Sequence, residues 1–245
     1  MKDVGELMRR LQKMMPAHTQ PAFKTAEELM AWQKEQGEIR AAALARENRA
    51  MKMQRTFNRS GIRPLHQNCS FENYKVECEG QMRALSQARQ YVGEFEGNIA
   101  SFIFAGKPGT GKNHLAAAIC NELLLRGRSV LIITVADIMS AMKETFSSRE
   151  NTEEQLLNDL SSVDLLVIDE IGMQTESRYE KVIINQIVDR RSSSKRPTGM
   201  LTNSTLDEMN KLLGERVMDR MRLGNSLWVN FNWDSFRSRV TGKEY

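Results

Sequence analysis

The chain has 245 residues, of which 40% are hydrophobic and 27% are charged, and its net charge is +4. This length allows one sizeable α/β core and a smaller second unit, because single domains commonly run to about 100–200 residues. No apolar run approaches the roughly 20 residues that a membrane span needs, and the N-terminal region has no signal-peptide core, so we expect a cytoplasmic protein.

The charge is distributed unevenly along the chain. Residues 1–70 have a net charge of +6 and the remainder a net charge of −2. The excess concentrates in a basic stripe from Arg40 to Arg63, in which Met51, Met53 and Phe57 are interleaved. Such a stripe can neutralise nucleic-acid phosphates or meet an acidic protein surface, and a merely solvated basic helix explains it equally well.

Three cysteines, Cys69, Cys78 and Cys120, indicate a reducing compartment and not a disulfide framework. His66 lies near the first two in the sequence. A zinc site needs four ligands, however, so structural thiols are the favoured interpretation.

Two helices are predicted in residues 1–60. Residues 3–15 place apolar side chains at helical spacing, and Thr25 with Glu28 forms a capping box that begins a long polar helix reaching Phe57. Few of their side chains are large and apolar, so an internal hairpin and a surface for a partner fit the pattern equally. The candidate anchors are Leu11, Leu29, Trp32 and Leu44. Residues 61–75 read as a linker.

Residues 76–245 alternate between helical and strand patterns. Buried strands are predicted near residues 99–105, 129–134, 164–170, 198–204 and 226–229, with helices at 81–95, after 111, at 137–146, at 177–194 and after 205. Continuous apolar strands separated by helices are typical of a parallel sheet with crossover helices on its faces. We therefore expect an α/β fold with a central five-stranded parallel sheet, preceded by a small all-α unit.

The first strand of this unit runs into a glycine-rich loop that ends in lysine. It matches the phosphate-loop pattern G-x-x-x-x-G-K-[ST] except at Asn113, which replaces the hydroxyl residue that normally contacts magnesium. The glycines let consecutive N–H groups turn around phosphates, and the following helix N-terminus favours negative charge. The amide oxygen of Asn113 is an acceptable Mg²⁺ ligand. The residues expected to bind ATP are Gly106, Lys107, Pro108, Gly109, Thr110, Gly111, Lys112, Asn113 and His114.

The strand at 164–170 ends in two carboxylates, Asp169 and Glu170. Asp169 is suited to hold the magnesium ion, together with Asn113. Glu170 is suited to orient or deprotonate the water that attacks the γ-phosphate. Together with the upstream loop, this pair predicts an ATPase.

Other residues each allow a functional and a purely structural interpretation. Asn203 ends a strand, where it could contact the γ-phosphate or simply cap the next helix. Arg216 and Arg220 lie on one helix face, where they could supply an arginine finger to a neighbouring subunit or simply form surface ion pairs. A DNA-contacting set could be formed by Lys143, Phe146 and Tyr179, although a phenylalanine that covers a helix end is commoner.

The ordered set of 106–113, 165–170, 201–203, 214–220 and Arg237 resembles the AAA+ ATPases of the initiator and helicase-loader branch. With the Met-rich N-terminal helices, essentially the whole chain is similar to the bacterial replicative helicase loaders, whose phosphate loop also ends in Lys-Asn.

That resemblance implies several roles. Residues 1–60 would bind a DnaB-type hexameric replicative helicase, and residues 76–245 would form an AAA+ domain that assembles as a helical hexamer around single-stranded DNA. ATP and Mg²⁺ would be the cofactors. The implied catalytic residues are Lys112 on phosphate, the Walker B pair Asp169 and Glu170, sensor 1 Asn203, the arginine finger Arg220 (or Arg216) and sensor 2 Arg237. Lys143, Phe146 and Tyr179 match the DNA-facing elements of this branch.

We therefore expect an ATP-controlled loader that places the helicase on single-stranded DNA during replication initiation or restart, with hydrolysis promoting release. Turnover should be weak for the protein alone and stimulated by single-stranded DNA. Two alternatives are an interaction protein with ATP as a structural ligand, and a transposition ATPase of related fold that acts on duplex DNA.

Overall fold

The computed structural model describes residues 10, 25–57, 62–96, 99–146, 152–173 and 177–236. The chain divides into two compact units, residues 1–45 and 46–245. The helix predicted at residues 3–15, with Leu11, lies outside the described residues, apart from Arg10. Arg237 also lies outside them. None of the described helices is long and apolar enough to cross a membrane.

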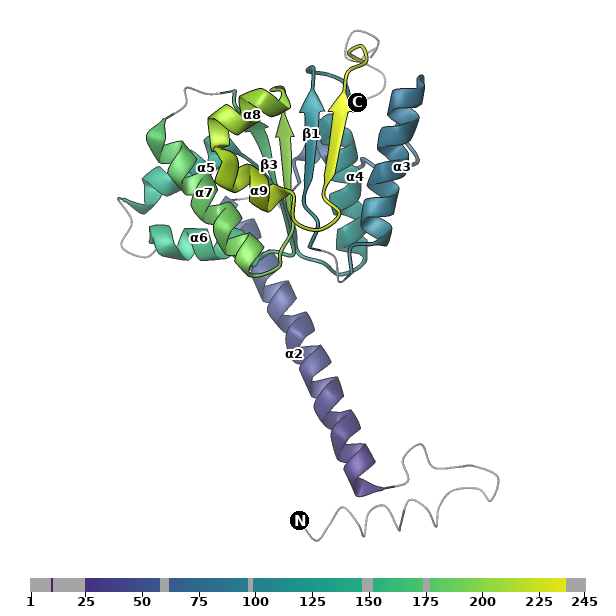
Figure 1. The fold of residues 1–245 in the computed structure, drawn as a ribbon. Helices are drawn as coiled ribbons and strands as arrows, with labels where there is room; N and C mark the ends of the chain where they lie inside the picture. Colours follow the sequence, from purple (N-terminus) through teal and green to yellow (C-terminus); the bar gives the residue numbers. More distant parts are fainter. Residues whose placement is uncertain are drawn as a thin grey trace. The chain divides into compact units, whose positions relative to one another are not determined.

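A single long helix, α2 (Ala26–Phe57), begins at Thr25, as the capping pattern predicts (Figure 1). The hydroxyl of Thr25 accepts a hydrogen bond from the backbone N–H of Glu28 at 3.1 Å, which satisfies one of the donors that a helix N-terminus leaves open. The helix exposes large apolar side chains, namely Met30, Trp32, Ile39 and Leu44.

The second unit is built on a five-stranded sheet with the strand order β2-β3-β4-β1-β5, in which every neighbouring pair is parallel. This confirms the predicted sheet. The strands are short apolar runs because helices cover both of their faces. They are β1 (Phe102–Gly106), β2 (Val130–Thr134), β3 (Leu165–Ile171), β4 (Thr198–Thr202) and β5 (Leu227–Phe231).

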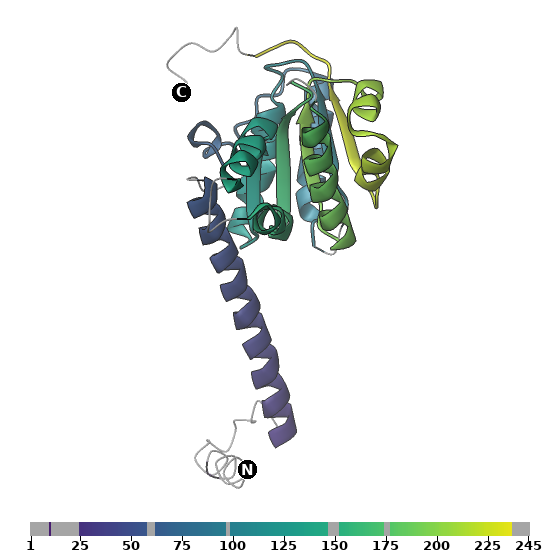
Figure 2. The same cartoon turned by 90° about the vertical axis from the view of Figure 1, so that its left-hand side faces the viewer.

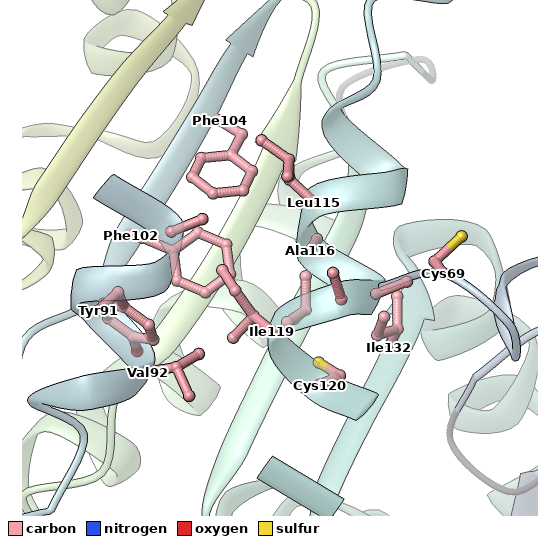
Figure 3. Packing of buried hydrophobic residues seen from close by; sticks show 14 of the residues in the cluster. Cys69, Tyr91, Val92, Phe102, Phe104, Leu115, Ala116, Ile119, Cys120 and Ile132 are labelled. Carbon is pink, nitrogen blue, oxygen red and sulfur yellow. The ribbon is translucent and has the colours of Figure 1, made fainter. Parts of the chain in front are cut away.

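One face of the sheet is covered by α3 (Glu79–Gly93) and α4 (Lys112–Leu125). Figure 3 shows Phe102 and Phe104 of β1 packed among side chains of these helices, and Cys120 of α4 is fully buried in the same cluster. Residues 62–74, within the stretch expected to be a linker, include the short 3-10 helix η1 (Pro64–His66) and add Phe71 and Tyr74 to this cluster. This stretch is therefore part of the packed core.

The other face is covered by a second layer of helices, which faces the viewer in Figure 2. The layer consists of α5 (Val135–Thr145), α6 (Glu153–Ser162), α7 (Arg178–Ser193), α8 (Leu206–Leu213) and α9 (Glu215–Met221). The sequence interpretation did not include α6. Its signal is a capping box, because the Thr152 hydroxyl accepts from the N–H of Gln155 and the Gln155 side chain accepts from the N–H of Thr152.

A fully buried arginine joins this layer to the starts of two strands. The Arg191 guanidinium of α7 donates to the carbonyl oxygens of Leu160 and Val163, at 3.1 and 2.9 Å, and to the hydroxyl of Thr198 at 3.1 Å. Burial lowers the pKa of Arg191 to about 9. The side chain satisfies carbonyl groups that would otherwise be buried without a partner.

Candidate nucleotide-binding site

The candidate site lies where the carboxyl ends of the central strands meet. The glycine-rich loop follows β1, and Asn203 follows β4. Thr134, the last residue of β2, is the register partner of Asp169 in β3. In open α/β sheets, ligands bind at this edge. The topology therefore brings together Lys112, Asn113, Asp169 and Asn203 from separate parts of the sequence, as the phosphate-loop interpretation requires.

Two glycines of the loop are required by its geometry. Gly111, the residue before α4, has φ = +94°, and a Cβ there would lie 2.8 Å from the Tyr74 ring. Gly106 has φ = +144°, and a Cβ there would lie 2.1 Å from the carbonyl oxygen of Phe231. A side chain at either position would meet both backbone strain and a steric clash.

The segment after β5 forms hydrogen bonds with the phosphate loop. The Trp233 indole N–H donates to the carbonyl oxygen of Thr110 at 2.8 Å. The backbone N–H of Phe236 donates to the carbonyl oxygen of Gly109 at 2.8 Å. Sequence interpretation missed Trp233, Phe236 and Tyr74 as loop-supporting residues. The available signal was an aromatic cluster directly after the last strand.

Lys112 is folded onto its own loop. Its ammonium group donates to the carbonyl oxygens of Gly106 and Lys107, at 2.6 and 2.8 Å, and to the Asn203 side-chain oxygen at 2.9 Å. The residue is buried. Since an ammonium group is a compact charge with three donors, a bound phosphate would compete directly for these bonds.

The Asn113 side chain faces the Asp169 carboxylate. Its amide N–H donates to Asp169 Oδ2 at 2.6 Å, and Asp169 Oδ1 accepts from the backbone N–H of Glu170 at 2.7 Å. Burial raises the pKa of Asp169 despite these bonds. Because burial disfavours the charged form, a cation at this carboxylate would stabilise that form.

This pair fits Mg²⁺, which binds through one or two protein oxygens together with phosphate oxygens and water. Asp169 would supply a carboxylate oxygen, and Asn113 would turn its amide to supply a neutral one. Among the described residues, no group of three or more His, Cys, Asp or Glu side chains is placed to hold a metal ion.

Glu170 projects from a strained turn. Its backbone has φ = +61°, which is uncommon for a residue with a side chain, and its side chain is exposed. The Met173 N–H donates to the Glu170 carbonyl oxygen at 3.3 Å, which closes the turn. The turn places the exposed Glu170 carboxylate one residue beyond Asp169.

A second cation near the site was missed by sequence interpretation. The Arg63 guanidinium lies 3.7 Å from the carboxylate of Asp137, which accepts a hydrogen bond from the Thr134 hydroxyl at 2.7 Å. The Arg63 charge also opposes the rise in the pKa of Asp169. Only its membership of the basic stripe distinguished this arginine in the sequence.

Two of the three candidate DNA-binding residues lie together on the surface. The rings of Phe146 and Tyr179 have centroids 6.4 Å apart, and Phe146 is 70% exposed. Lys143 lies in the last turn of α5, three residues before Phe146. The Tyr179 hydroxyl donates to the Glu153 carboxylate at 3.1 Å. An exposed aromatic pair of this kind offers a stacking surface for bases.

Arg216 and Arg220 lie apart from this site, on α9. Arg220 forms an ion pair with Asp189 of α7, and the Arg216 guanidinium lies 3.8 Å from the same carboxylate. Arg220 lines a hollow with Ser101 and Thr198, at the opposite end of the strands from the phosphate loop. Neither arginine therefore serves the nucleotide site of its own subunit in this structure.

The family described as "IstB-like ATP binding protein" matches residues 4–243. The chain belongs to this IstB-like ATP-binding protein family.

Individual relatives match the chain over nearly its whole length. The replicative helicase loader DnaC of Escherichia coli strain K12 is 86% identical over 245 residues, 100% of each chain. The replicative helicase loader DnaC of Buchnera aphidicola subsp. Schizaphis graminum is 64% identical over 242 residues, 98% of each chain. A crystal structure titled as the DnaC helicase loader superposes with a TM-score of 0.61 at 23% identity, covering 68% of this chain and 99% of that chain. This last likeness supports the fold.

Proposed function

We propose that this protein is an ATP-controlled loader of a DnaB-type hexameric replicative helicase, acting in the bacterial cytoplasm during replication initiation or restart. One observation carries the proposal: a relative named as a replicative helicase loader is 86% identical over the complete chain. The phosphate loop, the buried Asp169 and the exposed Glu170 supply the ATP site that such a role needs.

Hydrolysis is proposed to follow the usual logic of phosphoryl transfer, in which the protein supplies positioning and charge. Lys112 leaves its loop carbonyls to contact the β- and γ-phosphates. Asp169 and Asn113 would hold Mg²⁺, which would supply positive charge beside the phosphates, and Glu170 orients the attacking water. Asn203 acts as sensor 1 beside Lys112, and Arg237 acts as sensor 2. The products are ADP and phosphate.

The arginine finger is proposed to come from a neighbouring subunit of a helical hexamer. The position of Arg220 at the far end of the strands from its own phosphate loop supports this. Arg216 is the alternative, since its side chain is 74% exposed and that of Arg220 is 20% exposed. An isolated subunit would then hydrolyse ATP weakly, and single-stranded DNA would stimulate the assembly.

The contacts with single-stranded DNA and with the helicase are proposed to lie on two separate surfaces. Single-stranded DNA stacks on Phe146 and Tyr179 while Lys143 meets phosphate. The helicase contacts residues 1–60 through Leu11, Leu29, Trp32 and Leu44. Leu29 and Trp32 are three residues apart on α2, so they lie on one face, as helix-in-groove recognition requires.

Light scattering of this protein with its cognate replicative helicase, an ATP analogue and single-stranded DNA tests the proposal. Trp32→Ala should abolish the complex while nucleotide binding persists. Lys112→Ala should keep the helicase contact and lose the tight multimer. Glu38→Ala is the control, because Glu38 is also exposed on α2 and, nine residues from Leu29, lies on the opposite face of the helix. Failure of the unaltered protein to bind the helicase would refute the proposal.

A further inference from the structure

Two arginines of α9 share one carboxylate of α7. Arg216 and Arg220 lie one turn apart, and the Asp189 carboxylate pairs with the first through Oδ2 and with the second through Oδ1. The side chain of Arg216 is 74% exposed, whereas that of Arg220 is 20% exposed. Asp189 therefore holds Arg220 close against α7 and leaves Arg216 largely in solvent.

The other surroundings of the Arg220 guanidinium are unfavourable for a cation. Its Nη1 atom is buried and has no hydrogen-bond partner within the part of the chain that the structure describes. The hollow that Arg220 lines also contains the cationic side chains of Lys195 and Arg196, and none of the described residues that line it is acidic. A buried donor without an acceptor is costly, and like charges nearby add to the cost. The ion pair with Asp189 offsets this cost.

Packing fixes the backbone of α9, which leaves rotation of the side chain as the way to move the Arg220 guanidinium. Three of the seven residues of the helix are buried in the apolar cluster that also contains Val188 of α7, namely Val217, Met218 and Met221. Interiors packed in this way resist the sliding of one helix over another. A long arginine side chain can instead change rotamer and carry its charge from the hollow to the surface.

We propose that Asp189 is a positioning residue that holds Arg220 in a retracted position until the nucleotide of a neighbouring subunit competes for it. This inference rests on the function proposed above, in which an arginine of α9 serves a neighbour's ATP. A triphosphate carries more negative charge than one carboxylate and can accept from both ends of the guanidinium, Nη1 included. Arg220 then leaves Asp189 and the hollow, so breaking this ion pair slows the delivery of the finger.

The retracted position is tested first on the full chain without nucleotide, helicase or DNA. Phenylglyoxal modifies guanidinium groups that solvent reaches, and peptide mass spectrometry measures the rate at each arginine. In the unaltered protein, Arg216 should react several times faster than Arg220. Asp189→Asn keeps the size of the side chain and removes its charge. It should raise the rate at Arg220 by a factor of about 1.5 to 5, which corresponds to the loss of one partly exposed ion pair.

The second measurement is ATP turnover by the assembly with the cognate helicase and single-stranded DNA. Asp189→Asn should raise kcat by the same factor of about 1.5 to 5 and leave KM for ATP unchanged, because it does not alter the phosphate loop. Asp189→Glu restores a carboxylate and should reverse both the rise in kcat and the faster modification. Adding Arg220→Ala to Asp189→Asn should remove the gain in kcat.

Glu154→Gln is the matched control. It removes the charge of the carboxylate that pairs with Arg190, the residue after Asp189 on α7, and should change neither the modification of Arg220 nor kcat.

Unchanged or slower modification of Arg220 in Asp189→Asn overturns the inference, whatever the turnover shows. It is also overturned if kcat of Asp189→Asn is unchanged or lower while Arg220→Ala alone abolishes turnover. If Arg220→Ala leaves the turnover of the assembly intact, the finger assignment in the proposed function is wrong, and this inference is overturned with it.

Discussion

Replacing Gly111 by alanine should damage the phosphate loop in two separable ways. An alanine at φ = +94° costs about 1–2 kcal/mol of backbone strain. Its Cβ would also lie 2.8 Å from the buried Tyr74 ring, and overpacking of this kind costs about 1–3 kcal/mol. The total, about 2–5 kcal/mol, corresponds to a fall of roughly 4–20 °C in Tm for a unit of this size. ATP affinity should fall at least about tenfold, because the loop must shift to relieve the clash.

Thermal unfolding without nucleotide, together with titration of a fluorescent ATP analogue, measures both effects. Gly127→Ala is the matched control, because Gly127 has φ = +71° and a Cβ there would meet open space. A double-mutant cycle with Tyr74→Leu isolates the clash, since the smaller side chain should remove the packing cost and leave the backbone cost. Equal losses of stability in Gly111→Ala and Gly127→Ala, with ATP affinity retained, would refute the reasoning.

Three further changes give distinct results. Burial raises the pKa of Asp169, so the stability of the native fold falls as pH rises through the window that begins at the ordinary value of 3.8. At pH 7.5, Asp169→Asn should therefore increase the free energy of unfolding in urea by about 0.5–2 kcal/mol while ATP turnover is lost. A variant less stable than the unaltered protein would contradict this. Arg191→Met should cost about 3–5 kcal/mol in urea unfolding, because it leaves several buried carbonyl groups without donors, whereas Arg190→Met on the same helix should cost no more than about 1 kcal/mol. Arg220→Ala should lower the ATPase of the DNA-bound assembly by a factor of about 10³ or more without changing ATP affinity, and the same loss in Arg216→Ala alone would move the finger to that residue.

Much of the fold could be predicted because its signals are local. Apolar runs that end in glycine or in paired carboxylates marked β1 and β3, and Thr25 marked the start of α2. The pattern missed α6, whose capping box at Thr152 was present in the sequence. The sequence also predicted a linker at residues 61–75, although Phe71 and Tyr74 are buried in the cluster that covers one face of the sheet. Burial of a short irregular segment depends on what it packs against, which spacing does not show.

In the candidate site, too, some features could be predicted from local sequence patterns and others could not. The placement of Lys112 and Asp169 at neighbouring strand ends could be predicted, because phosphate and metal chemistry restricts the residue types expected there; their roles stay predictions. The contact of Trp233 could not be predicted, because its partner, the Thr110 carbonyl oxygen, is distant in the sequence. No periodicity or motif marks such contacts.

The most direct test of the loader function is a helicase-loading assay. The cognate helicase is offered protein-coated single-stranded DNA with a forked end, and the rate of strand separation is measured with and without this protein in the presence of ATP. We predict that unwinding depends on this protein, that Trp32→Ala abolishes the stimulation, and that Glu38→Ala on the opposite face of α2 leaves it intact. Unwinding at the same rate without this protein, or unaffected by Trp32→Ala, would contradict the proposal.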